Sequence, residues 1–140
     1  LDEKVDHGPI LRQVKCDTGN EETSESLLQK LARASGDLLV ETIPRFISGE
    51  IKPTPQDETQ ATYTKKFKTE DAAVDLKTDA PEIIWRKIRA LNPEPGVYTM
   101  NFPSREGTRV KLLDADFKDG KLFIKTIQPE GKKPIRLPSS

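Results

Sequence analysis

The sequence has very little of the residue types from which most enzyme sites are built. Among its 140 residues there are one cysteine and one histidine, and aromatic residues make up 6%. Cys16 has no second thiol with which to form an internal disulfide, which is typical of a reducing cytosol. No ligand spacing indicates a zinc site, so we expect no metal. Leucine, isoleucine and valine must therefore supply most of the core.

Longer patterns are missing as well. No apolar run approaches the roughly 20 residues that a transmembrane helix requires, so we expect no membrane partner. The chain begins at Leu1 without the charged and apolar segments of a signal peptide, which indicates an internal start. There is no glycine-rich phosphate loop and no Ser/His/Asp spacing. Asp6 precedes the single His7, but neighbours in an extended chain point apart, and the local sequence favours Asp6 as a turn acid.

Charge divides the chain into two parts, although the formal net charge is zero. Residues 1–60 hold 7 Lys/Arg and 12 Asp/Glu, whereas residues 61–140 hold 16 Lys/Arg and 11 Asp/Glu. A basic half is the one expected to contact a polyanion such as nucleic acid. Ordinary scatter of surface charge explains the same counts, so charge alone leaves both interpretations open.

The first part of the chain indicates one strand, two helices and a linker. Residues 10–16 are typical of a half-buried strand. Residues 23–36 predict a first helix with a threonine cap and a closing glycine. Residues 37–48 predict a second helix that Pro44 should kink or displace. The polar, proline-containing residues 50–61 predict a semi-extended linker.

The second part begins with a short edge strand, predicted at residues 63–67, and a single helical turn near Thr69. A longer helix follows at residues 79–91, where Asp79 and Glu82 have the spacing of a capping box. Its apolar residues recur at helical spacing and predict one buried face, made of Ile84, Ile88 and Leu91.

Arg86 and Arg89 project nearly opposite this buried face. They would be available to an external partner, although an ordinary solvated helix face is the commoner arrangement.

Beyond the Pro-Glu-Pro-Gly bend at residues 93–96 the apolar period changes to two, which predicts strands. We expect strands at residues 97–102, 109–117 and 122–128, with Leu113, Ala115 and Phe117 on one side of the second. Asp119 and Gly120 form the strongest hairpin signal, because both positions of such a turn need positive φ. The short sheet must pack on the preceding helix to cover its apolar face.

The last twenty residues are rich in lysine and arginine and hold one glutamate. A run of cations on a hairpin end and tail suits contacts with phosphates, which give affinity without reading a base sequence. A solubilising tail would have the same composition.

Four stretches can be compared with a known family. Residues 1–11 follow the pattern Met-Asp-x-x-x-Asp-x-Gly-Pro-Ile, in which Asp6 is the second acid. Residues 88–98 follow Arg-Ala-x-x-Pro-x-Pro-Gly-Ala-Tyr, and residues 127–134 follow a Gln-Pro-Glu-Gly-Lys-Lys ending. Together with residues 57–63 they span nearly the whole chain. The sequence therefore resembles the C-terminal part of the methionyl-tRNA formyltransferase family.

The resemblance implies an α+β fold in two parts. Residues 1–49 would be the C-terminal strand and helices of a Rossmann-like formyltransferase domain, and residues 50–62 a linker. Residues 63–140 would be a small open β-barrel, OB-like and of Greek-key type, with one packed helix and a tRNA-binding surface.

The resemblance also implies a function. The family transfers a formyl group from 10-formyltetrahydrofolate to the methionine of initiator tRNA in translation initiation, and we expect a monomeric full enzyme in a bacterial cytoplasm or an organelle. Asp6 matches the family's catalytic aspartate, which works with an asparagine and a histidine. The expected tRNA contacts are Arg86, Arg89, Lys132, Lys133 and Arg136.

Departures from the family leave alternatives open. Its Asn-x-His segment and Ser-Leu-Leu-Pro loop are absent here, so we expect the chain alone to be inactive. Leu76 stands where the family usually has tryptophan, and residues 116–122 replace a longer excursion, which leaves barrel closure open. One alternative is a related folate-dependent formyltransferase that acts on an amino sugar nucleotide or hydrolyses formyl-folate. The other is a stand-alone nucleic-acid-binding module.

Overall fold

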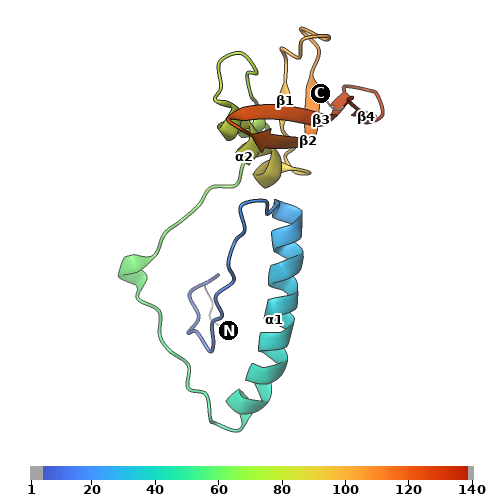
Figure 1. Ribbon diagram of the computed structural model, residues 1–140. Coiled ribbons are helices and arrows are strands. Elements are labelled where there is room, and N and C mark those ends of the chain that lie inside the picture. The colour runs from blue at the N-terminus through green and yellow to red at the C-terminus, as the bar shows by residue number, and fades with distance from the viewer. Residues whose placement is uncertain (1–4, 139–140) are drawn as a thin grey trace. The chain divides into compact units, whose positions relative to one another are not determined.

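A computed structural model describes residues 5–138 of the chain (Figure 1). The chain divides into two compact units. Unit 1 consists of Leu1–Asn20 and Ser26–Lys65, and unit 2 consists of Glu21–Glu25 and Lys66–Ser140. Each unit is described by itself below.

Unit 1 is dominated by one long helix, α1 (Ser24–Ile47). The prediction of two helices separated at Gly36 is wrong, because the helix continues through this glycine. A glycine inside a helix costs only about 1 kcal/mol relative to alanine, which the surrounding helix formers outweigh. Pro44 does not break the helix either, because α1 continues to Ile47. Proline lacks only its own N–H, and its carbonyl still accepts the Ser48 N–H at 2.9 Å. Gly49 then ends the helical region at a φ of +78°.

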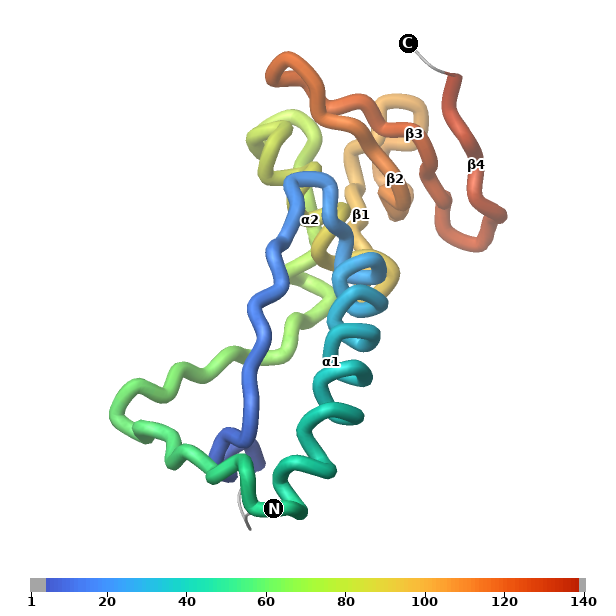
Figure 2. The backbone as a smooth tube through the Cα atoms, turned by 60° about the horizontal axis from the view of Figure 1, so that its bottom comes forward, coloured from blue at the N-terminus to red at the C-terminus, as the bar shows by residue number. Residues whose placement is uncertain are grey.

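The predicted strand at residues 10–16 is also wrong. Only Ile10 pairs, in an isolated antiparallel bridge with Thr54 in which each N–H donates to the other carbonyl at 2.8 Å. A strand needs a neighbour along its length, and residues 11–16 have no backbone partner among the described residues. The segment instead runs beside α1 in the direction opposite to the helix (Figure 2).

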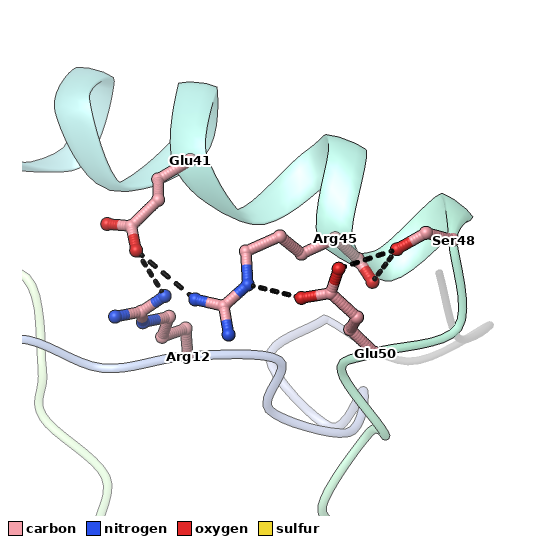
Figure 3. Close-up of polar contacts among 5 residues, drawn as sticks. All are labelled: Arg12, Glu41, Arg45, Ser48 and Glu50. Atoms are coloured by element: carbon pink, nitrogen blue, oxygen red, sulfur yellow. Dashed lines mark hydrogen bonds and ion pairs between the residues drawn. The ribbon is translucent and has the colours of Figure 1, made fainter.

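Side-chain ion pairs connect this extended segment to α1 (Figure 3). Arg12 donates to Glu41 at 2.7 Å, and Arg45 bonds both Glu41, at 3.3 Å, and Glu50, at 3.0 Å. Glu50, through its hydrogen bond, raises the pKa of Arg45. These pairs are exposed, so each contributes little to stability, roughly 0–1 kcal/mol for a typical surface pair.

Residues 50–62 form no strand or α-helix, and their role as a linker between domains stays a prediction. The region contains one 3₁₀ turn, η1 (Glu58–Gln60), which Asp57 caps by accepting the Thr59 N–H at 3.0 Å. The edge strand predicted at residues 63–67 does not form, since none of these residues pairs with another strand.

Unit 2 consists of a 3₁₀ turn, one α-helix and a four-stranded antiparallel sheet. The helical elements are η2 (Thr69–Ala72) and α2 (Pro81–Leu91). The strands are β1 (Tyr98–Thr99), β2 (Val110–Lys118), β3 (Lys121–Pro129) and β4 (Ile135–Arg136). The sheet is open, with the order β1-β2-β3-β4 (Figure 1). Its strands follow chain order, so it is a meander and the expected Greek-key connection is not present among residues 5–138.

Helix α2 covers one face of this sheet, as predicted. Ile84, Ile88 and Leu91 are buried against the strands, and Trp85 joins them with its ring stacked on Phe117 at a centroid distance of 5.5 Å. Pro81 occupies the first turn, but the predicted capping box does not form. Asp79 instead accepts the Asp75 N–H at 2.9 Å, which leaves the helix without a side-chain cap.

A β-bulge in the β2–β3 pair changes which residues face the core. Leu112 pairs with Ile127 and Ala115 with Ile124, whereas the register shifts on both sides of Asp114. Leu112 and Ala115 consequently both point inward, although they are three residues apart. The prediction that Leu113 shares a side with Ala115 is therefore wrong.

The Asp119–Gly120 hairpin turn is confirmed, with φ values of +51° and +74°. Strand 97–102 is reduced to the two residues of β1, because Met100 leads into the turn that Gly107 closes by donating to the Met100 carbonyl at 2.9 Å. No helix within the described residues is long and apolar enough to cross a membrane.

Candidate nucleic-acid interface

Asn92 fastens the bend between α2 and the sheet. Its Oδ1 accepts the Val97 N–H at 3.0 Å, and its Nδ2 donates to the Leu112 carbonyl at 2.8 Å. The Gly96 N–H donates to the Leu91 carbonyl at 2.8 Å, with Gly96 at a φ of +86°. One side chain thus holds the end of the helix, the start of β1 and the bulge of β2 together, which fixes the surfaces built on them.

The outer face of the sheet, opposite α2, carries cations next to an aromatic ring. Tyr98 and Lys111 are direct cross-strand partners in the β1–β2 pair. The guanidinium carbon of Arg109, just before β2, lies 3.8 Å from the centre of the Tyr98 ring. This stack is a cation–π contact that orients a long cationic side chain at the sheet surface.

Arg109 and Lys111 line a shallow depression of about 250 Å³. We call it the Arg109–Lys111 notch, and its remaining lining residues are Gln128, Pro129, Glu130 and Gly131. Sequence reasoning did not single out Tyr98, Arg109 or Lys111 as a site. The alternation of Arg109 and Lys111 along one strand was the available signal, because it places both on the same face.

Three predicted tRNA contacts lie after β3 in the same unit. Lys132 and Lys133 belong to the turn between β3 and β4, and Arg136 lies in β4, opposite Thr126. All three side chains are exposed, and none of them forms an ion pair with an acid among residues 5–138. Gln128 donates to the Lys132 carbonyl at 3.0 Å and so steadies the turn. The structure thus brings these three cations onto one strand connection.

The two predicted arginines of α2 have internal contacts. Arg86 is exposed and pairs with Glu82, one turn earlier, at 2.6 Å. Arg89 lies with its guanidinium carbon 3.8 Å from the centre of the Trp85 ring and donates to the Glu22 carbonyl at 3.1 Å. Arg89 is therefore partly buried, unlike the outward-facing arginine that helical spacing alone predicted.

Two lysines of the β2–β3 hairpin are paired with acids. Lys125 contacts Asp116 at 2.8 Å and Asp114 at 3.1 Å, and Lys118 contacts Asp116 at 3.7 Å. The hydrogen bond from Lys125 lowers the pKa of Asp116, so both partners stay charged at neutral pH. Lys118 and Lys125 are therefore less available to a phosphate than Lys132, Lys133 and Arg136, which have no ion pair with an acid among residues 5–138.

Asp6 lies in unit 1, where it is exposed at a φ of +63°. Gln56 donates to the Asp6 carbonyl at 2.9 Å and to the Gly8 carbonyl at 2.7 Å. His7 contacts Glu58 rather than Asp6, through Nδ1 and Oε2 at 2.8 Å. The structure thus holds the backbone of Asp6 in place but gives its carboxyl group no histidine partner, and its catalytic role stays a prediction.

A depression of about 570 Å³ beside Asp6 is lined by residues that do not suit a folate. Its charged lining residues are Asp6, Asp57 and Glu58, with no arginine or lysine. A folate carries carboxylates on its glutamate tail, which three acids would repel. These residues do not fit the donor, and among residues 5–138 no group of three or more His, Cys, Asp or Glu could hold a metal ion.

Comparisons with known proteins agree on one family. The family described as "Formyl transferase, C-terminal domain" matches residues 66–121. The methionyl-tRNA formyltransferase of Kosmotoga olearia is 40% identical over 120 residues, which cover 85% of this chain and 37% of that protein. That of Bacillus cereus is 32% identical over 152 residues, which cover 94% of this chain and 48% of that protein.

A solved structure, methionyl-tRNA formyltransferase from Clostridium thermocellum, matches with a TM-score of 0.61 at 24% identity. The match covers 92% of this chain and 52% of that one, and it supports the fold. The chain spans between a third and a half of the length of the curated relatives it matches. The chain therefore carries a formyl transferase C-terminal domain and belongs to the methionyl-tRNA formyltransferase family, whose C-terminal part it matches.

Proposed function

We propose that this chain works as part of a methionyl-tRNA formyltransferase and that unit 2 binds the tRNA. The full enzyme would transfer a formyl group from 10-formyltetrahydrofolate to the amino group of methionine on initiator tRNA. The observation that carries the proposal is the exposed cationic set Lys132, Lys133 and Arg136, which lies within the unit that carries the formyl transferase C-terminal domain. We further propose a monomeric enzyme in a bacterial cytoplasm or an organelle, with Asp6 at its catalytic centre.

Phosphate groups are the chemical feature that such a surface recognises. Each lysine or arginine that neutralises a phosphate releases condensed counterions, so affinity falls as salt rises. Lys132, Lys133 and Arg136 form no ion pair with an acid among residues 5–138, so no internal ion pair has to be broken when they bind a phosphate. This is the property expected of residues that hold a backbone without reading bases.

Arg86 and Arg89 of α2 would contribute less to tRNA binding, because contacts within the chain already hold their guanidinium groups. Arg86 would have to exchange Glu82 for a phosphate, which reduces the net gain because an existing 2.6 Å contact is lost. Arg89 is held by Trp85 and the Glu22 carbonyl, so it would reach a phosphate only with the part of the guanidinium left exposed. We therefore rank Lys132, Lys133 and Arg136 as the principal contacts.

The proposal is tested by measuring the affinity of the chain for initiator tRNA by fluorescence anisotropy. The triple variant Lys132→Gln, Lys133→Gln, Arg136→Gln should bind at least about tenfold more weakly, since three phosphate contacts are removed. The matched control Lys66→Gln, Lys68→Gln, Lys121→Gln removes the same charge from exposed sites elsewhere in unit 2 that likewise have no ion pair among residues 5–138, and it should change affinity by less than about threefold.

Two outcomes would contradict the proposal. Equal losses in the triple variant and its control would mean that only net charge matters. Binding of a nucleotide-linked amino sugar with no binding of tRNA would favour the other class of folate-dependent formyltransferase.

A further inference from the structure

The Arg109–Lys111 notch is a preorganised cationic site. None of the residues expected to contact tRNA lines it. Stacking on Tyr98 holds the Arg109 side chain, and its Nε is buried without a hydrogen-bond partner. Arg109 is thus oriented by a ring rather than by an acid. Because its conformation is already restricted, binding a ligand costs less side-chain entropy than it would for a free arginine.

Lys111 is fixed at the same face. Its Nζ lies 3.5 Å from the point where a side chain on Gly96 would begin, an ordinary contact distance that places the ammonium group beside the bend. Cross-strand pairing sets Tyr98 on one side of Lys111 and Gln128 on the other. The notch therefore has a defined position between β1 and β3, with a lysine at its centre.

The charges in the notch do not cancel one another. Neither Arg109 nor Lys111 forms an ion pair with any acid of residues 5–138. Glu130 also lines the depression, and its backbone N–H donates to the Arg109 carbonyl at 3.0 Å, but its carboxylate pairs with neither cation. Two cations facing one carboxylate leave a net positive site that attracts an anion.

We propose that the Arg109–Lys111 notch binds a phosphate group of an RNA backbone. A guanidinium and an ammonium side by side, with the Gln128 amide as a further polar lining group, match the charge and hydrogen-bonding capacity of a phosphodiester. The inference deepens the proposed function and depends on it for the identity of the RNA.

The notch lies next to the principal contacts, so one RNA strand could reach both. Gln128 both lines the notch and donates to the Lys132 carbonyl, so the notch adjoins the turn that holds Lys132 and Lys133. Phosphates along one strand are regularly spaced, and adjacent cationic sites can neutralise successive ones. The notch would thereby add one phosphate contact to those of the turn.

Two single variants test the notch, because one should weaken tRNA binding and the other should strengthen it. Lys111→Gln removes the central cation and should weaken tRNA binding by about three- to tenfold. The slope of log affinity against log salt concentration should become smaller in magnitude by about one. Glu130→Gln removes the opposing carboxylate and should strengthen binding by about two- to fivefold. Lys121→Gln, at the far tip of the β2–β3 hairpin and without an ion pair among residues 5–138, is the charge-matched control and should leave affinity near that of the unchanged chain.

A second readout reports the contact without tRNA. The ¹⁵Nε–H resonance of Arg109 in the full chain is followed by NMR during addition of uridine, inorganic phosphate or a short oligouridylate. The proposal predicts a shift with inorganic phosphate and a larger one with oligouridylate, a smaller shift in Lys111→Gln, and none with uridine. A shift with uridine alone would mean base or sugar contact and would overturn the phosphate assignment.

The outcomes separate this inference from the proposed function. Tight tRNA binding that is unchanged by Lys111→Gln and by Glu130→Gln would overturn the notch and leave the proposed function standing. Absence of tRNA binding together with the Arg109 shift on phosphate addition would contradict the proposed function and retain the phosphate site. Proper folding of each variant is checked by its thermal midpoint, and Lys111→Arg should recover most of the lost affinity.

Discussion

The Oδ1 of Asn92 lies 3.0 Å from the backbone nitrogen of Val97, across the Pro-Glu-Pro-Gly bend. The same side chain donates from Nδ2 to the Leu112 carbonyl of β2 at 2.8 Å. Because Asn92 directly follows α2, this pair of hydrogen bonds couples the helix end to two strands of the sheet. The cationic outer face of the sheet depends on that coupling.

Replacing Asn92 with alanine should destabilise unit 2. The Val97 N–H and the Leu112 carbonyl would both lose a partner in a partly buried position, and we expect a loss of about 1–3 kcal/mol in the free energy of unfolding. Urea denaturation followed by Trp85 fluorescence measures it. Asn92→Asp keeps the acceptor for Val97 and should cost less than Asn92→Ala, whereas equal costs would contradict the role given to Oδ1.

Gly96 should tolerate no side chain. Its φ is +86°, and an added Cβ would lie 3.1 Å from the Pro93 carbonyl oxygen. We expect Gly96→Ala to destabilise the chain by about 1–2 kcal/mol from backbone strain, with a further loss from this contact. Gly107→Ala is the matched control, since Gly107 has a similar φ of +78° with nothing within 4 Å of the added atom. A Gly107→Ala cost equal to that of Gly96→Ala would show that the contact with Pro93 has no effect.

Asp75 should make the stability of unit 2 depend on acid pH. Its carboxylate accepts the Lys77 N–H at 2.7 Å and the Asn101 amide at 2.6 Å, and these bonds, the first most strongly, lower its pKa. The folded pKa is below the unfolded value of about 3.9, so the stabilisation is present above that pH and is lost as pH falls through the lowered pKa. In Asp75→Asn the thermal midpoint should fall less steeply between about pH 5 and pH 2 than in the unchanged chain. Glu94→Gln, which alters an exposed acid, is the control and should keep the original slope.

Local signals in the sequence predicted the elements that depend on one or two residues. The Asp119–Gly120 turn follows from the positive φ that both positions require. The buried face of α2 follows from apolar spacing within a single helix. By contrast, the sequence did not predict that α1 continues through Gly36. The free-energy cost of one glycine in a helix is small, and whether the helix continues depends on the stability of the residues on both sides.

Features that need contacts between distant segments were beyond sequence reasoning. The bulge at Asp114 reverses the side on which Leu113 lies, and no residue type in β2 signals it. Arg89 is four residues after Trp85, a spacing that permits contact, but its hydrogen bond to Glu22 depends on tertiary structure. The Arg109–Lys111 notch likewise appears only when the register of β1, β2 and β3 is known.

The salt dependence of tRNA binding tests the central claim most directly. The affinity of the unchanged chain for initiator tRNA is measured from about 50 to 200 mM salt, beside the variant Lys132→Gln, Lys133→Gln, Arg136→Gln. The account predicts a steep linear fall of log affinity with log salt, and a slope that is smaller by about two to three in the variant. An affinity that does not change with salt, or a variant with the slope of the unchanged chain, would contradict it.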